Sequence, residues 1–245
     1  MAKSNRGLPK LCGATVLALI MTASCGVNQT IVIRSDGSGT LAMHVEVSRL
    51  LHEYVARLSE VTDKPVLNSG GRFFDAVSLR KDFESRPGIT VTKAETPTPD
   101  SLDLELSFDS IQDVFAREET LKNTAALAYS ESDGKKTIRL HLDRGNYAQL
   151  ARTFPLLGNP AFAALGPQPN ETTSDADYLE MVRFSIGEDA PALLKKSYLT
   201  LTLNPEGEIV SQSGGDISGG AVVFRIPLLR LLVLDRPIDC TVTYR

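Results

Sequence analysis

The stretch Ile31–Ser48, IVIRSDGSGTLAMHVEVS, determines the fold class of this chain. Apolar residues alternate on both sides of Asp36-Gly37, and an Asp-Gly pair between two alternating runs is typical of a β-hairpin turn. Ser48 then precedes a segment in which Leu51 and Val55 recur at helical spacing, so we expect this serine to cap a helix. The stretch therefore predicts a hairpin followed by a helix.

A second stretch repeats this pattern. Ser35–Glu46 aligns with Ser132–Asp143, with the Asp-Gly pair, the apolar alternation and one histidine at matching positions. The second hairpin also leads into a helical segment, at residues 146–154. The chain therefore contains two ββα units, which are either products of an old duplication or two examples of a common hairpin type.

The remaining periodic segments are also hairpins and helices. Further strands are predicted at 88–95, 101–108, 198–203, 208–213, 221–226 and 238–244. Further helices are predicted at 73–83, 110–119 (with Asp109 as its cap) and 174–185. Hairpins that alternate with helices indicate an α+β fold with a mainly antiparallel sheet. No linker divides residues 30–245, so we expect a single α+β domain there.

The N-terminus has the features of an export signal. Residues 1–10 carry Lys3, Arg6 and Lys10 without an acidic residue, and residues 11–23 are apolar. That apolar run is too short for a bilayer, which takes about 20 residues. A basic start, a short apolar core and small residues at its exit predict a secretory signal peptide over residues 1–24. A buried N-terminal helix is the alternative.

Thr22-Ala23-Ser24-Cys25 resembles the lipobox of bacterial lipoproteins. This resemblance implies that residues 1–24 are removed and that a diacylglyceryl group is attached to the Cys25 thiol. Thr22 departs from the family pattern, in which Leu is usual. Thr22 and Ser24 also suit ordinary signal peptidase, which would release the protein without an anchor. With a lipid on Cys25, we expect residues 25–29 to form a tether of about 15 Å that keeps the body near the membrane.

The other cysteine of the mature chain belongs to the segment IDCTVTY, residues 238–244. Its period-2 pattern places Cys240 on the apolar face of a strand, where a lone thiol behaves as a small hydrophobe. A disulfide between Cys25 and Cys240 is the alternative. The sequence has no closely spaced set of Cys and His residues, so we predict neither a zinc site nor a cofactor.

The hairpin at residues 31–48 and the C-terminal run at 198–244 together resemble the LppM-type domain of envelope lipoproteins. The resemblance implies a curved sheet built of hairpins, with helices packed on one face and an apolar cavity for lipid-like ligands. It covers the two ends of the body, and residues 62–190 contribute nothing to it.

Charge and motif content exclude several functions. The net charge is −4, and without the three basic residues of the leader the chain has 23 basic and 30 acidic groups, a net of −7. Such a body repels nucleic acid. His44, His52 and His141 fall on polar faces, where we expect solvated side chains, and no catalytic motif accompanies them. We therefore expect a protein that is not an enzyme.

One Pro- and Gly-interrupted apolar segment, FPLLGNPAFAALGP at residues 154–167, is a candidate ligand or partner surface. Its large side chains either fill the core or form an exposed patch. The candidate patch residues are Phe154, Leu156, Leu157, Phe162 and Leu165.

These features together predict a lipoprotein of the bacterial cell envelope, anchored to a membrane through Cys25. We expect it to bind a hydrophobic, lipid-like ligand or an envelope protein. The alternatives are a structural or surface-exposed lipoprotein without a small ligand, and an envelope hydrolase. Carriage of a lipid requires an apolar cavity of several hundred Å³, the usual size of a ligand site.

Overall fold

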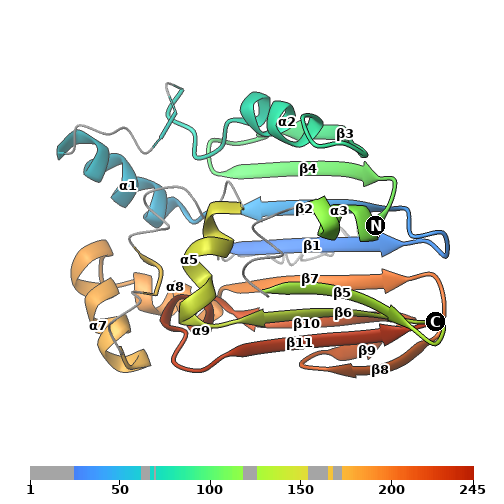
Figure 1. Cartoon of the computed structure of the whole chain (residues 1–245). Helices are drawn as coiled ribbons and strands as arrows, with labels where there is room; N and C mark the ends of the chain where they lie inside the picture. Colours follow the sequence, from blue (N-terminus) through green and yellow to red (C-terminus); the bar gives the residue numbers. More distant parts are fainter. Residues whose placement is uncertain (1–24, 62–66, 69, 118–125, 154–164, 168–172) are drawn as a thin grey trace, which may run out of the picture.

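The computed structural model of the protein describes residues 25–61, 67–68, 70–117, 126–153, 165–167 and 173–245. Its strands form two sheets around a shared hydrophobic core (Figure 1). The larger sheet has seven strands, in the spatial order β3 (Ile89–Glu95), β4 (Ser101–Phe108), β2 (Gly39–Glu46), β1 (Gly26–Ile33), β7 (Tyr198–Pro205), β10 (Ala221–Pro227) and β9 (Asp216–Ser218). The smaller sheet has four strands, in the order β5 (Leu127–Ser132), β6 (Lys135–Leu142), β11 (Ile238–Tyr244) and β8 (Ile209–Ser213).

The helices complete the predicted α+β fold. They are α1 (Arg49–Val61), α2 (Ala76–Glu84), α3 (Ile111–Arg117), α5 (Arg144–Thr153), α7 (Asp175–Ile186), α8 (Ala190–Lys196) and α9 (Leu228–Val233). Helix α2 packs along the edge strand β3, whereas α1, α7, α8 and α9 gather at the end of the sheets where β1 begins (Figure 1). The α+β class and the antiparallel hairpins are therefore confirmed, and the strands divide between two sheets.

Strand β1 begins four residues earlier than the sequence pattern suggests. Gly26 is already paired with Glu46 of β2 on one side and with Tyr198 of β7 on the other. The expectation of a tether at residues 25–29 is therefore wrong, because Gly26 to Gln29 lie inside a central strand. The sequence does not predict this early start, because the apolar alternation is broken by three polar residues, Asn28, Gln29 and Thr30. Backbone pairing on both sides stabilises this part of the strand instead.

Buried side chains form two clusters. The first fills the space between the sheets and includes Ile33, Val222 and Val242, each at most 1% exposed. The second lies at the helical end, where Val55 of α1 is fully buried beside Val45 of β2 and residues of α7. Replacing such an aliphatic side chain by alanine costs about 2–5 kcal/mol when the cavity stays open. The helical end is therefore a packed part of the body.

Two predicted helix caps have different outcomes. Ser48 caps α1 as expected, because its Oγ accepts a hydrogen bond from the Leu51 N–H at 3.3 Å. The expectation that Asp109 caps the helix predicted at 110–119 is wrong. Helix α3 begins at Ile111, and the Oγ of Ser110 accepts the Asp113 N–H at 3.1 Å. Ser110 directly precedes the helix and occupies the capping position instead.

The similarity between the two ββα units extends to a third strand. Strand β4 (SLDLELSF) pairs with β2, and β11 (IDCTVTY) pairs with β6 in the equivalent register. In this register His44 lies opposite Asp103, and His141 lies opposite Asp239. The two ββα units therefore each pair with a third strand that places an aspartate opposite the histidine.

Candidate lipid-attachment site

Cys25 occupies a fixed position at the start of β1. Its neighbour Gly26 is held between β2 and β7, and the Cys25 Sγ accepts a hydrogen bond from the backbone N–H of Ser48 at 3.1 Å. The side chain is half-buried. The same hydrogen bond remains available after S-alkylation, because a thioether sulfur keeps its acceptor lone pairs. The surroundings are therefore compatible with a lipid on this sulfur.

Helix α7 forms one wall beside Cys25. It begins after Ser174, whose Oγ accepts the Asp177 N–H at 3.2 Å, and it ends at Gly187, whose φ of +139° suits glycine. Tyr178, Val182 and Ile186 are spaced at four-residue intervals and are buried toward the other helices. This face of α7 gives the site an apolar wall.

Helices α8 and α9 supply further lining of the same space. Ser197, 1% exposed, ends α8, and its Oγ donates to the Leu193 carbonyl at 2.8 Å. The Ser197 carbonyl accepts the Leu228 N–H at 2.9 Å, which joins α8 to the start of α9. The structure shows a short helix with Leu231, Leu232 and Val233 buried.

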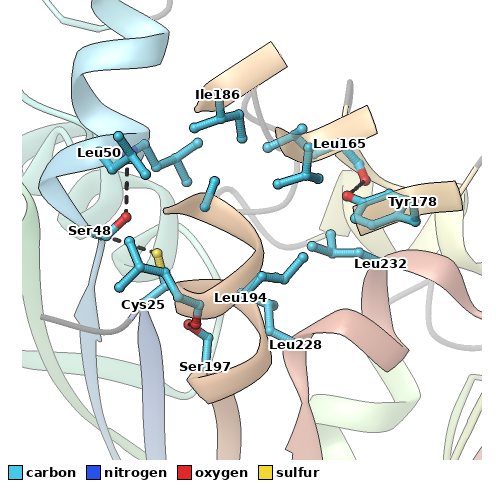
Figure 2. A pocket seen from close by; sticks show the side chains of 14 residues that line it. Cys25, Ser48, Leu50, Leu165, Tyr178, Ile186, Leu194, Ser197, Leu228 and Leu232 are labelled. Atoms are coloured by element: carbon cyan, nitrogen blue, oxygen red, sulfur yellow. Dashed lines mark hydrogen bonds between the residues drawn. The ribbon is translucent and has the colours of Figure 1, made fainter. Parts of the chain in front are cut away.

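These walls enclose an apolar pocket of about 70 Å³ (Figure 2). Cys25, Ser48 and Ser197 line it, together with side chains that are almost entirely aliphatic: Leu50, Leu51, Leu165, Val182, Ile186, Ala190, Leu193, Leu194, Leu228, Leu232 and, as the one aromatic, Tyr178. The pocket is far smaller than the roughly 300 Å³ lower bound for drug-sized ligands. Its volume suits a short hydrocarbon segment.

The polar atoms around the pocket already have partners within the chain. The Tyr178 hydroxyl donates to the Leu165 carbonyl at 2.6 Å, and burial raises the pKa of this phenol. The hydroxyls of Ser48 and Ser197 are engaged with backbone groups of their own helices. Ligand sites orient their ligands with a few well-placed polar groups. None of these three hydroxyls is directed at a ligand, so the side chains that line the pocket present a hydrocarbon surface.

The two described cysteines are free and lie in different clusters. Cys240 is 5% exposed in the core between the sheets, and burial raises the pKa of its thiol to about 11. Cys25 packs against the cluster at the helical end. The prediction of a buried Cys240 on the apolar strand face is confirmed, and the structure contains no Cys25–Cys240 disulfide.

The candidate patch is described at one position. Phe154, Leu156, Leu157 and Phe162 lie outside the described residues. Leu165 is 9% exposed and packs in the cluster at the helical end, where it also lines the pocket. For Leu165, the structure therefore selects burial over an exposed patch.

The three histidines each face a carboxylate that the sequence pattern did not identify. His44 Nδ1 lies 2.7 Å from Asp103 Oδ1, and His141 Nδ1 lies 2.8 Å from Asp239 Oδ1. His52 Nδ1 contacts Asp100 in the same way. The hydrogen bond to Asp239 raises the pKa of His141. Among the described residues, no group of three His, Cys, Asp or Glu side chains has an arrangement that could hold a metal ion.

Two parts of the helical end were not predicted from the sequence. Helix α8 was not predicted, because its seven residues contain Pro191 and are too few to show periodicity. The outward face of α7 was also overlooked, although Met181 and Phe184 are out of phase with the buried residues of that helix. This outward face could have been found from the helical spacing of Met181 and Phe184 within the predicted helix at 174–185. No helix among the described residues has the length and apolarity to cross a membrane.

The fold and this site define an α+β protein with an apolar pocket at its first described cysteine. No model of a known protein family matches the chain, and the search of curated proteins found no match. Among solved structures, the chain is similar to the folded domain of LppM from Mycobacterium tuberculosis. The TM-score is 0.41 at 10% identity, covering 91% of this chain and 90% of that domain. A likeness at this level says nothing about what either protein binds.

Proposed function

We propose that this chain is a non-enzymatic lipoprotein of the bacterial cell envelope, anchored by a diacylglyceryl group on the Sγ of Cys25. Support comes from the export signal and lipobox-like residues before Cys25, and from the apolar pocket that Cys25 lines. Two acyl chains are sufficient for stable anchoring, at about 0.8 kcal/mol for each buried CH₂.

The position of Cys25 carries the proposal. Cys25 lines the pocket together with Leu50, Leu194 and Leu228, so aliphatic side chains surround the space next to it. Because β1 begins at Gly26, no flexible spacer separates the lipid from the sheet. The anchor therefore holds the body directly, with the helical end toward the bilayer.

The small size of the pocket argues against the enclosure of a whole lipid. A volume of about 70 Å³ does not enclose a whole lipid, so this pocket does not supply the several hundred Å³ that carriage of a lipid needs. The proposed role is to hold a folded surface at the membrane, where it meets an envelope protein or a lipid at the bilayer surface.

Metabolic labelling with a radioactive fatty acid tests the anchor. We expect the wild-type protein to incorporate the label and Cys25→Ala to lose it entirely. Cys240→Val is the matched control, because it removes the other mature cysteine and keeps an apolar side chain in the core. Equal labelling of wild type and Cys25→Ala, or no label in wild type, would contradict the proposal.

A further inference from the structure

Helix α7 has a second apolar face, formed by Met181 and Phe184. Their exposed fractions are 42% and 93%, and Phe184 is the most exposed large hydrophobic side chain among the described residues. Residues three positions apart lie on the same side of a helix, so the two form one small patch. Single exposed apolar residues are ordinary on protein surfaces, whereas a paired patch marks a contact surface when its location supplies a partner.

The position of the patch on the molecule indicates which partner it contacts. Tyr178, Val182 and Ile186 on the inner side of α7 line the pocket that Cys25 also lines. The Met181–Phe184 patch is on the other side of the same helix, about 10 Å away, which is the diameter of a helix with its side chains. A lipid on Cys25 would therefore start from a pocket that α7 also lines, at the helical end of the molecule.

We propose that Met181 and Phe184 form a second membrane contact and enter the interface of the bilayer that holds the Cys25 lipid. This inference rests on the proposed anchor. Helices that lie in a membrane interface bury an apolar face in the region between headgroups and acyl chains. With both contacts made, α7 lies along the bilayer surface and the sheets point away from it.

The charges near the patch indicate an apolar rather than an electrostatic contact. Helix α7 carries three acidic side chains and one basic side chain: Asp175, Asp177 and Glu180 against Arg183. Arg183 and Glu180 are also paired with each other. A helix with a net charge of −2 gains nothing from anionic headgroups. Insertion is therefore expected to be no stronger in anionic than in zwitterionic bilayers.

The absence of tryptophan from the chain allows a direct test. Phe184→Trp places a single fluorophore on the patch of the mature, lipidated protein. The control is Ile217→Trp on β9, whose wild-type side chain is 59% exposed. Ile217 pairs with Val222 near the start of β10, whereas the end of β10 pairs with Tyr198 beside Gly26. The control therefore lies at the end of the sheet remote from Cys25.

Both variants are bound to phosphatidylcholine vesicles with and without lipids brominated in the acyl chains. We expect the Phe184→Trp emission to shift to the blue and to be quenched by bromine, with no stronger quenching when phosphatidylglycerol is added. The Ile217→Trp emission should stay unshifted and unquenched. A vesicle-bound Phe184→Trp protein with solvent-like, unquenched emission would overturn the inference and leave the anchor standing. A blue shift that needs only high protein concentration, without vesicles, would overturn it in favour of self-association.

Discussion

The backbone N–H of Ser48 donates a hydrogen bond to the Cys25 Sγ at 3.1 Å, which joins the first residue before β1 to the residue that caps α1. Ser48 is 5% exposed and Cys25 is half-buried, so this contact is partly shielded from solvent. The lipid-bearing sulfur of the proposed anchor is therefore tied to the helical end. Changes at Ser48 and around the pocket should be measurable as changes in stability.

Ser48→Ala should destabilise the unlipidated body by about 1 kcal/mol, the usual cost of losing a serine helix cap. The Ser48 Oγ accepts the Leu51 N–H, and alanine leaves this buried donor without its partner. Urea unfolding followed by circular dichroism measures the free energy of unfolding. Ser185→Ala, at an exposed position near the end of α7, is the control and should change it by less than about 0.5 kcal/mol. Equal stabilities of Ser48→Ala and wild type would exclude this capping role.

Tyr178→Phe should cost about 1–3 kcal/mol, because it leaves the buried Leu165 carbonyl without the phenol that donates to it at 2.6 Å. Tyr54→Phe, a half-buried position on α1, removes the same hydroxyl away from this contact and should be nearly neutral. The two variants are compared by thermal unfolding. Equal effects would show that the Tyr178–Leu165 bond does not stabilise the helical end.

Gly39→Ala should be destabilising by about 1–3 kcal/mol, the typical cost of overpacking. A Cβ at residue 39 would lie 2.1 Å from the Val32 carbonyl oxygen and 2.4 Å from the Phe108 ring. Gly26→Ala on the neighbouring strand has open space and is the matched control. If both alanines lower the denaturation midpoint equally, the close approach of β1, β2 and β4 at Gly39 is wrong.

The His141–Asp239 pair should stabilise the fold in a limited pH range. Its hydrogen bond raises the pKa of His141 above 6.5, so this contribution is complete below pH 6.5 and is lost as the pH rises through the raised value. The same bond lowers the pKa of Asp239 below 3.8, so its contribution is present above pH 3.8 and is lost as the pH falls through the lowered value. The pair is therefore most stabilising between about pH 4 and 6.5.

A double-mutant cycle with His141→Gln and Asp239→Asn measures this pair. Both side chains are partly exposed, so the coupling energy at pH 5.5 should be below about 1 kcal/mol, and salt should weaken it. At pH 8.5 it should fall toward zero. A coupling energy that is larger at pH 8.5 than at pH 5.5 would contradict the direction of the His141 shift.

Local patterns predicted the elements of the fold better than their assembly. The Asp133-Gly134 turn has positive φ at both residues, as expected for a two-residue hairpin, and the strict alternation of β11 correctly placed Cys240 inside. The parallel pairing of β1 with β7 joins segments about 170 residues apart along the chain, and no local signal encodes such a partner.

In the candidate site, too, the local features were predictable from the sequence and the tertiary arrangement was not. The residues before Cys25 and the cap at Ser48 could be recognised in the sequence, because each depends on its immediate neighbours. The pocket could not, since it combines side chains of α1, α7, α8 and α9 that only tertiary packing brings together. The start of β1 at Gly26 was hidden for a similar reason, because backbone pairing with two other strands makes it.

The central claim is a lipid on the sulfur of Cys25, and intact mass spectrometry of the mature protein from a bacterial membrane fraction tests it most directly. The account predicts a chain that begins at Cys25 and carries a diacylglyceryl group on its N-terminal residue, with Cys240 unmodified. A chain that begins at Cys25, or at any later residue, without an acyl group would contradict it.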